Sequence, residues 1–114
     1  MTNNLTDINE AKVKKYVESI RPVDPEIRKQ VDIDYSFDGN TFELFEIRPQ
    51  WNDSTEMIKS SFAKIRYYKS RNEYNLYWMR ASGKWELYEP FPTSKKLEAI
   101  LEVIKEDAHA CFFG

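Results

Sequence analysis

The chain has 114 residues, 15% of them aromatic and 32% charged, with a formal net charge of −2 at pH 7. This length is typical of one domain, and the abundance of large apolar side chains excludes an intrinsically disordered chain. One cysteine and one histidine exclude an intramolecular disulfide and a Cys/His zinc site. We therefore expect a single domain over residues 1–114, with no metal or cofactor.

The location of the protein follows from the same features. The first residues lack the charged and apolar regions of a signal peptide, and a lone cysteine is typical of a reducing compartment. No apolar run approaches the roughly 20 residues that cross a membrane. We expect a cytoplasmic protein that does not bind membranes.

The charge is unevenly distributed along the chain. Residues 59–85 hold seven basic side chains and a single acidic one, whereas the segments before and after are both net acidic. The middle of the chain is therefore basic within an acidic protein.

Two helical segments open the chain. A helix from about Ile8 to Ile20 is predicted because four apolar residues recur at the spacing of one helix face: Val13, Tyr16, Val17 and Ile20. Pro22 ends this helix, and Asp24-Pro25-Glu26 predicts a single helical turn through about Lys29.

Strands follow, and most of them are short. Residues 31–37 alternate apolar and polar side chains, and Asp38-Gly39-Asn40 predicts a hairpin turn into a strand over residues 41–48. That second strand carries apolar residues on both faces, so we expect it to be central and covered on both sides. Residues 49–60 are predicted to be a long loop.

Three further strands are predicted over residues 62–69, 74–80 and 84–89, joined by short polar links that require antiparallel pairing. A last helix, capped by Thr93 or Ser94, carries a wide apolar stripe. The predicted class is α+β: an antiparallel sheet of about five strands in meander order, flanked by an N-terminal and a C-terminal helix.

Four separated strings indicate a family. They are Glu43-Leu44-Phe45-Glu46-Ile47-Arg48-Pro49 followed by Trp51, Tyr77-Trp78-Met79-Arg80-Ala81, Lys84-Trp85, and Cys111-Phe112-Phe113-Gly114. Together they resemble an uncharacterised bacterial domain of unknown function, DUF3024, over nearly the whole chain. The resemblance implies a stand-alone bacterial protein of this size and implies no activity.

One candidate catalytic group lies on the second strand. Glu46 and Arg48 are two residues apart and therefore share a face, and Asp34 and Glu43 lie nearby on the hairpin. Carboxylates in such a hairpin could hold Mg²⁺ in a nuclease-like phosphodiesterase. Arg48 stays protonated and is a poor proton-transfer group, so a structural ion pair is the simpler interpretation.

A candidate binding surface lies on the basic, aromatic strands. We expect Arg66, Tyr68, Trp78 and Arg80 to form it, because cations beside rings bind the phosphates and bases of single-stranded nucleic acid. The alternative is an ordinary wet sheet face with cross-strand Tyr/Arg neighbours. Arg48 and Trp51 are added as binding candidates, although a loop tryptophan can also cover the edge of a core.

The end of the chain is unusually apolar. Phe112 and Phe113 would expose large surfaces unless they pack onto the domain or onto a partner. Three hypotheses stay open: a non-enzymatic module that binds protein or single-stranded nucleic acid, a metal-dependent phosphodiesterase, and a homo-oligomer joined through Phe112 and Phe113.

Overall fold

A computed structural model describes residues 4–107 and Phe112. Its α-helices are α1 (Asn4–Ile20), α2 (Pro25–Arg28) and α3 (Leu97–Glu106), and a 3-10 turn covers Lys69–Arg71. Helix α1 begins four residues earlier than the apolar spacing predicts. Helix α2 begins as predicted, because the Asp24 carboxylate accepts a hydrogen bond from the Glu26 backbone N–H and Pro25 occupies the first helical position.

Six strands form one sheet in this part of the chain. They are β1 (Asp32–Asp38), β2 (Thr41–Gln50), β3 (Asp53–Tyr68), β4 (Glu73–Met79), β5 (Trp85–Leu87) and β6 (Thr93–Ser94). The order is β1-β2-β3-β4-β5, every pair is antiparallel, and β6 also pairs with β4. The predicted α+β class and meander order are confirmed.

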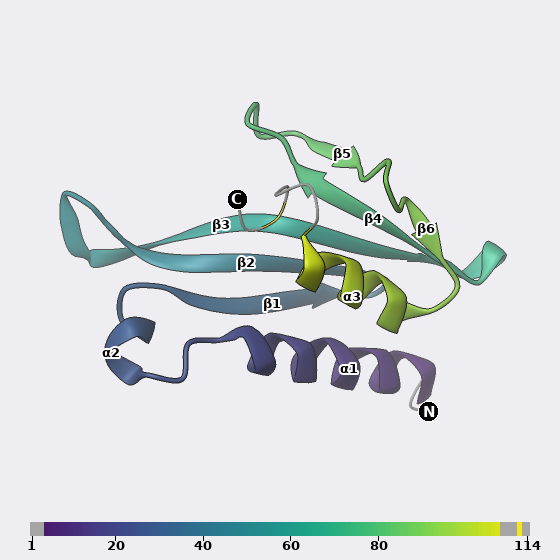
Figure 1. The fold of residues 1–114 in the computed structure, drawn as a ribbon, viewed down its shortest axis with the longest axis horizontal. Helices are drawn as coiled ribbons and strands as arrows, with labels where there is room; N and C mark the ends of the chain where they lie inside the picture. Colours follow the sequence, from purple (N-terminus) through teal and green to yellow (C-terminus); the bar gives the residue numbers. More distant parts are fainter. Residues whose placement is uncertain (1–3, 108–111, 113–114) are drawn as a thin grey trace.

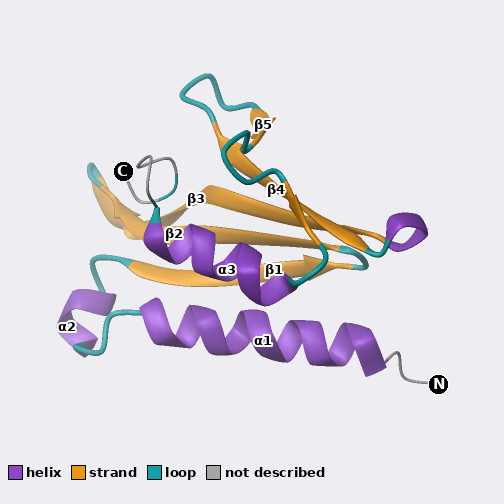
Figure 2. Cartoon of the chain, turned by 45° about the vertical axis from the view of Figure 1, so that its right-hand side comes forward, coloured by secondary structure: helices purple, strands orange, loops and turns teal. Residues whose placement is uncertain are grey.

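The core lies between the sheet and the two long helices, which run along the same side of it (Figures 1 and 2). Val13 and Val17 of α1 and the apolar stripe of α3 pack against side chains on the helix side of four strands: Ile33, Phe42, Leu44, Ala63, Ile65, Tyr74 and Leu76. Each fully buried aliphatic side chain stabilises the fold by roughly 1.5–3 kcal/mol. No helix among the described residues is both long enough and apolar enough to span a membrane.

The predicted loop over residues 49–60 is wrong. Strand β2 continues to Gln50 and β3 starts at Asp53, so only Trp51 and Asn52 form the turn of a long hairpin (Figure 1). Pro49 pairs with Met57 inside this hairpin. A proline is tolerated there because β2 pairs with β1 only as far as Ile47 and is an edge strand beyond it.

The prediction for β2 is correct in one part and wrong in another. The strand is central, between β1 and β3, but helices cover only the face that carries Phe42 and Leu44. On the other face Phe45 is buried without a helix, and the Lys59 ammonium group lies 4.9 Å from its ring centroid. Strand β3 has a β-bulge opposite Leu44 and Phe45. Leu44 pairs with Ala63 and Phe45 with Ser61, so Phe62 is the extra residue of the bulge.

The start of the last helix also differs from the prediction. Thr93 and Ser94 form the short strand β6, and α3 begins at Leu97 with Lys96 as its N-cap residue. The Ser94 hydroxyl still accepts a hydrogen bond from the backbone N–H of Lys96, so it stabilises the turn that leads into the helix.

Phe112 packs back onto the domain. Its side chain is 4% exposed and its ring centroid lies 4.9 Å from that of Tyr88. Its backbone N–H donates a hydrogen bond to the Asp107 carboxylate. Phe112 is therefore part of the core and is not free to join two chains, while Phe113 lies outside the described residues.

Candidate functional site

The side of the sheet away from α1 and α3 carries the candidate site, and we call it the open face. Residues directly opposite each other in antiparallel strands share a face. Leu44 and Ala63 form a buried pair beneath the helices, so the flanking pairs point the other way. The open face therefore includes three cross-strand rows: Glu43, Lys64 and Tyr77; Thr41, Arg66 and Asn75; and Tyr68 with Glu73.

Cations lie over aromatic rings along this face. The Lys64 ammonium group is 4.8 Å from the ring centroid of Tyr77 and 5.2 Å from that of Trp85. The guanidinium carbons of Arg66 and Arg71 are 4.9 Å and 4.4 Å from the ring centroid of Tyr68. These contacts hold charges and rings in one layer, which is the arrangement that a stacking and phosphate-binding surface needs.

Two tyrosines join the rows of the open face. The hydroxyl oxygens of Tyr68 and Tyr77 are 3.1 Å apart. The hydrogen bond to Tyr77 raises the pKa of Tyr68. Burial acts to raise the pKa of Tyr77, but hydrogen bonds from Tyr68 and Asn75 and the charges of Lys64 and Arg66 outweigh it and lower that pKa. Either hydroxyl can donate in this hydrogen bond.

Asn75 lies between these tyrosines in the register, opposite Arg66. It is 8% exposed, and its side-chain oxygen has no hydrogen-bond partner within the described structure. A buried acceptor without a donor is costly, by about 1–3 kcal/mol. The centre of the open face thus holds an unused hydrogen-bond acceptor beside its cations.

The four residues predicted to form one surface lie on two faces. Arg66 and Tyr68 are on the open face, whereas Trp78 pairs with Ala63 and packs against the core. Arg80 follows Trp78 to that side, where its Nε donates to Glu86 at 3.0 Å. The prediction of a shared face is therefore wrong, because Trp78 and Arg80 alternate with Tyr77 and fall on the opposite side of β4.

Lys64, Arg71, Tyr77 and Trp85 take the places of Trp78 and Arg80 on the open face. The sequence pattern alone does not select any of these four as a site residue. The alternation within a strand shows which of its side chains share a face. Only the pairing of Lys64 with Tyr77 shows which face of β4 lies on the same side of the sheet as a given face of β3.

The candidate carboxylates do not come together. Glu46 pairs with Ile33 and so lies on the helix side, whereas Asp34 and Glu43 point to the open face. Glu46 accepts hydrogen bonds from Arg48 at 2.9 Å and 2.8 Å, which is the structural ion pair. No group of three or more acidic, histidine or cysteine residues in the described part of the chain could hold a metal ion.

Trp51 lies at the turn between β2 and β3 and is 92% exposed. Its ring therefore does not cover the core, and the interpretation of Trp51 as a lid is wrong. Met57 and Ile58, on the same hairpin, are also about half exposed, at 51% and 45%. This hairpin carries three exposed large apolar side chains, more than the two, Val23 and Ile27, at and just before the helical turn α2.

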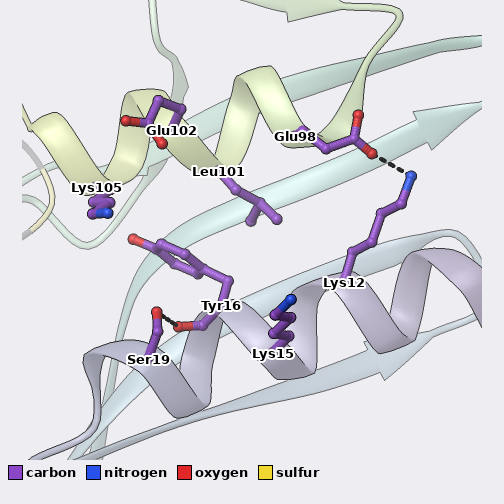
Figure 3. A pocket seen from close by; sticks show the side chains of 8 residues that line it. All are labelled: Lys12, Lys15, Tyr16, Ser19, Glu98, Leu101, Glu102 and Lys105. Atoms are coloured by element: carbon purple, nitrogen blue, oxygen red, sulfur yellow. Dashed lines mark hydrogen bonds and ion pairs between the residues drawn. The ribbon is translucent and has the colours of Figure 1, made fainter.

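A groove between α1 and α3 is a separate concave feature, with a cavity volume of about 370 Å³ (Figure 3). An ion pair between Lys12 and Glu98 closes one end. The Tyr16 hydroxyl reaches toward Lys105 and Glu102 at the other end and has no hydrogen-bond partner among the described residues. Burial, with Glu102 and Asp107 adding to it, raises the pKa of Tyr16 well above its usual value.

The comparisons with known proteins settle the family. The profile of DUF3024, a domain of unknown function, matches residues 2–114. The chain belongs to DUF3024. Neither the curated proteins nor the solved structures contain a match. This match confirms the resemblance found in the sequence. Because the family is one of unknown function, the function proposed for this DUF3024 chain is based on its own open face.

Proposed function

We propose that this protein is a non-enzymatic binding module that takes up single-stranded nucleic acid on its open face. The supporting observation is the layer in which Lys64, Arg66 and Arg71 lie over the rings of Tyr68, Tyr77 and Trp85. Single-strand binders use cations to follow the phosphates and rings or guanidinium planes to stack the bases.

The geometry suits a single strand better than a duplex. The layer is part of a sheet face, and the described residues present no helix on that side to enter a major groove. A flat row of rings needs unpaired bases that can turn toward it.

The net negative charge of the chain weakens its affinity for nucleic acid, but the cations of the open face are still present. Lys64, Arg66 and Arg71 lie close together on the open face, so the potential over their rings is more positive than the net charge of −2 suggests, although Glu43 lies opposite Lys64 and Glu73 pairs with Arg71. With about three phosphates neutralised, the logarithm of the affinity should fall with the logarithm of salt concentration with a slope of about −2.

The test compares two charge-matched double variants. Lys64→Gln with Arg66→Gln removes two cations from the open face, and Arg48→Gln with Arg80→Gln removes two from the opposite face. Fluorescence anisotropy with a labelled single-stranded oligonucleotide at low salt should show a loss of roughly tenfold or more for the first variant. The second should bind like the wild type, and equal losses in both would contradict the proposal.

A further inference from the structure

The long hairpin leaves one edge of β3 without a partner. Strand β4 pairs with β3 only from Ala63 onward, so within the described structure no strand covers the outer edge of residues 53–61. We call this stretch the free edge. Figure 1 shows the hairpin extending beyond the neighbouring strands. Unpaired N–H and C=O groups along such an edge can pair with another strand.

The side chains of the free edge do little to prevent pairing. Met57 and Ile58 are half exposed, and among residues 55–61 only Glu56 and Lys59 are charged. Natural edges are usually blunted by prolines, inward-pointing charges or a covering element. The proline of this hairpin is Pro49, which lies on β2 and leaves the β3 edge unprotected.

We propose that the free edge pairs antiparallel with the same edge of a second copy of this chain. In an antiparallel pair of identical strands, a two-fold axis runs perpendicular to the sheet, and opposite residues share a face. One residue must therefore face its own copy on the axis. The free edge spans residues 53–61, and an axis at residue 57 or 58 keeps at least three residues on each side of it within that edge.

The chemistry of the side chains selects Ile58. Centred there, Ile58 faces Ile58, Met57 faces the aliphatic stem of Lys59, Glu56 faces Ser60, and Thr55 faces Ser61. Apolar groups meet apolar groups, polar groups meet polar ones, and no like charges are opposed. Centred on Met57, Glu56 would face Ile58 and lose hydration without gaining a partner.

This pairing has a consequence for the proposed binding surface. Because the axis is perpendicular to the sheet, the open faces of both copies lie on the same side of one continuous sheet. The evidence for the dimer is the free edge and its register alone. A negative result for nucleic-acid binding would therefore not contradict the dimer.

Light scattering of the full chain from micromolar to millimolar concentration tests the dimer. The wild type should pass from monomer to dimer, and Ile58→Asp should stay monomeric because two carboxylates then face each other on the axis. Arg48, opposite Ile58 on β2, can pair with the new carboxylate within one chain and keep the hairpin folded. Val23→Asp is the matched control, since Val23 is 89% exposed and distant from the edge along the chain, and it should dimerise normally.

A disulfide test checks the register. With Cys111 replaced by serine, Ile58→Cys should form an intermolecular disulfide under mild oxidation, because only the residue on the axis faces its own copy. Thr55→Cys should not. A monomeric wild type at millimolar concentration, a dimer unchanged by Ile58→Asp, or equal crosslinking at both cysteines would overturn the proposal, and the crosslinking result holds even if Ile58→Asp does not fold.

Discussion

Glu43 is the acidic side chain that lies directly opposite Lys64 on the open face. A nucleic-acid phosphate near Lys64 would be repelled by it, so Glu43→Gln should tighten oligonucleotide binding by roughly two- to threefold at low salt. Glu46→Gln removes the same charge from the helix side of the same strand and should leave the affinity unchanged. Anisotropy titrations of both variants measure the difference, and a weaker or unchanged affinity for Glu43→Gln would argue against phosphates at this row.

Asp32 makes a two-point ion pair with Arg21, with both N–H···O distances at 2.8 Å. The hydrogen bonds from Arg21 lower the pKa of this carboxyl in the folded chain. The ion pair therefore stabilises the fold above the unfolded pKa of about 4, and this contribution is lost as the pH falls further.

Asp32→Asn should accordingly cost about 1 kcal/mol at neutral pH. Urea unfolding at several pH values should show that the wild type loses its advantage over the variant between about pH 5 and pH 2. A constant difference across that range would mean that Arg21 does not hold the Asp32 carboxylate.

The sequence predicts which side chains of one strand share a face. It does not predict which faces of neighbouring strands lie on the same side of the sheet. Arg66 and Tyr68 were correctly placed together because they are two residues apart on β3. Trp78 falls on the other side because its register against β3 is set by the link over residues 69–72, after which Glu73 pairs with Tyr68. A shift of one residue moves every side chain of a strand to the other face, and local spacing cannot reveal it.

At the scale of elements, the first hairpin and the helices were the most predictable parts. The Asp38-Gly39-Asn40 turn and the alternation of β1 determine one register, and the apolar spacing of α1 and α3 determines their buried faces. The long hairpin was missed because Pro49 and the polar residues after Trp51 are typical of loops. Its strands are formed by pairing between distant residues, which local propensity does not encode.

Gly39 allows the β1–β2 turn to close. Its φ is +65°, in the left-handed region, and a Cβ placed there would meet no atom within 4 Å. The cost of Gly39→Ala is thus conformational and should be about 1–2 kcal/mol. Gly39→Asn should cost less, since asparagine tolerates this region. Thermal unfolding of both variants tests the difference, and equal losses would place the cost elsewhere.

At the scale of the molecule, Phe112 ties the end of the chain to the core. The Phe112→Ala variant removes a ring that packs on Tyr88 and should lower the free energy of unfolding by about 3–5 kcal/mol. Chemical denaturation is the measurement. A loss below about 1 kcal/mol would show that the last residues contribute little to the fold.

The whole molecule has two sides with different roles. One side of the sheet carries both long helices and nearly all of the core, and the other carries the layer of cations and rings. Variants of the open face should therefore change binding with little effect on stability, whereas variants of the helix side should do the reverse.

The most direct test of the binding face is an amide NMR titration of the ¹⁵N-labelled protein with a single-stranded oligonucleotide at low salt. The open-face account predicts saturable shifts at Lys64, Arg66, Tyr68, Asn75 and Tyr77, with the amides of α1 and α3 unchanged. Shifts confined to the groove between the helices, or no shifts at millimolar oligonucleotide, would contradict it.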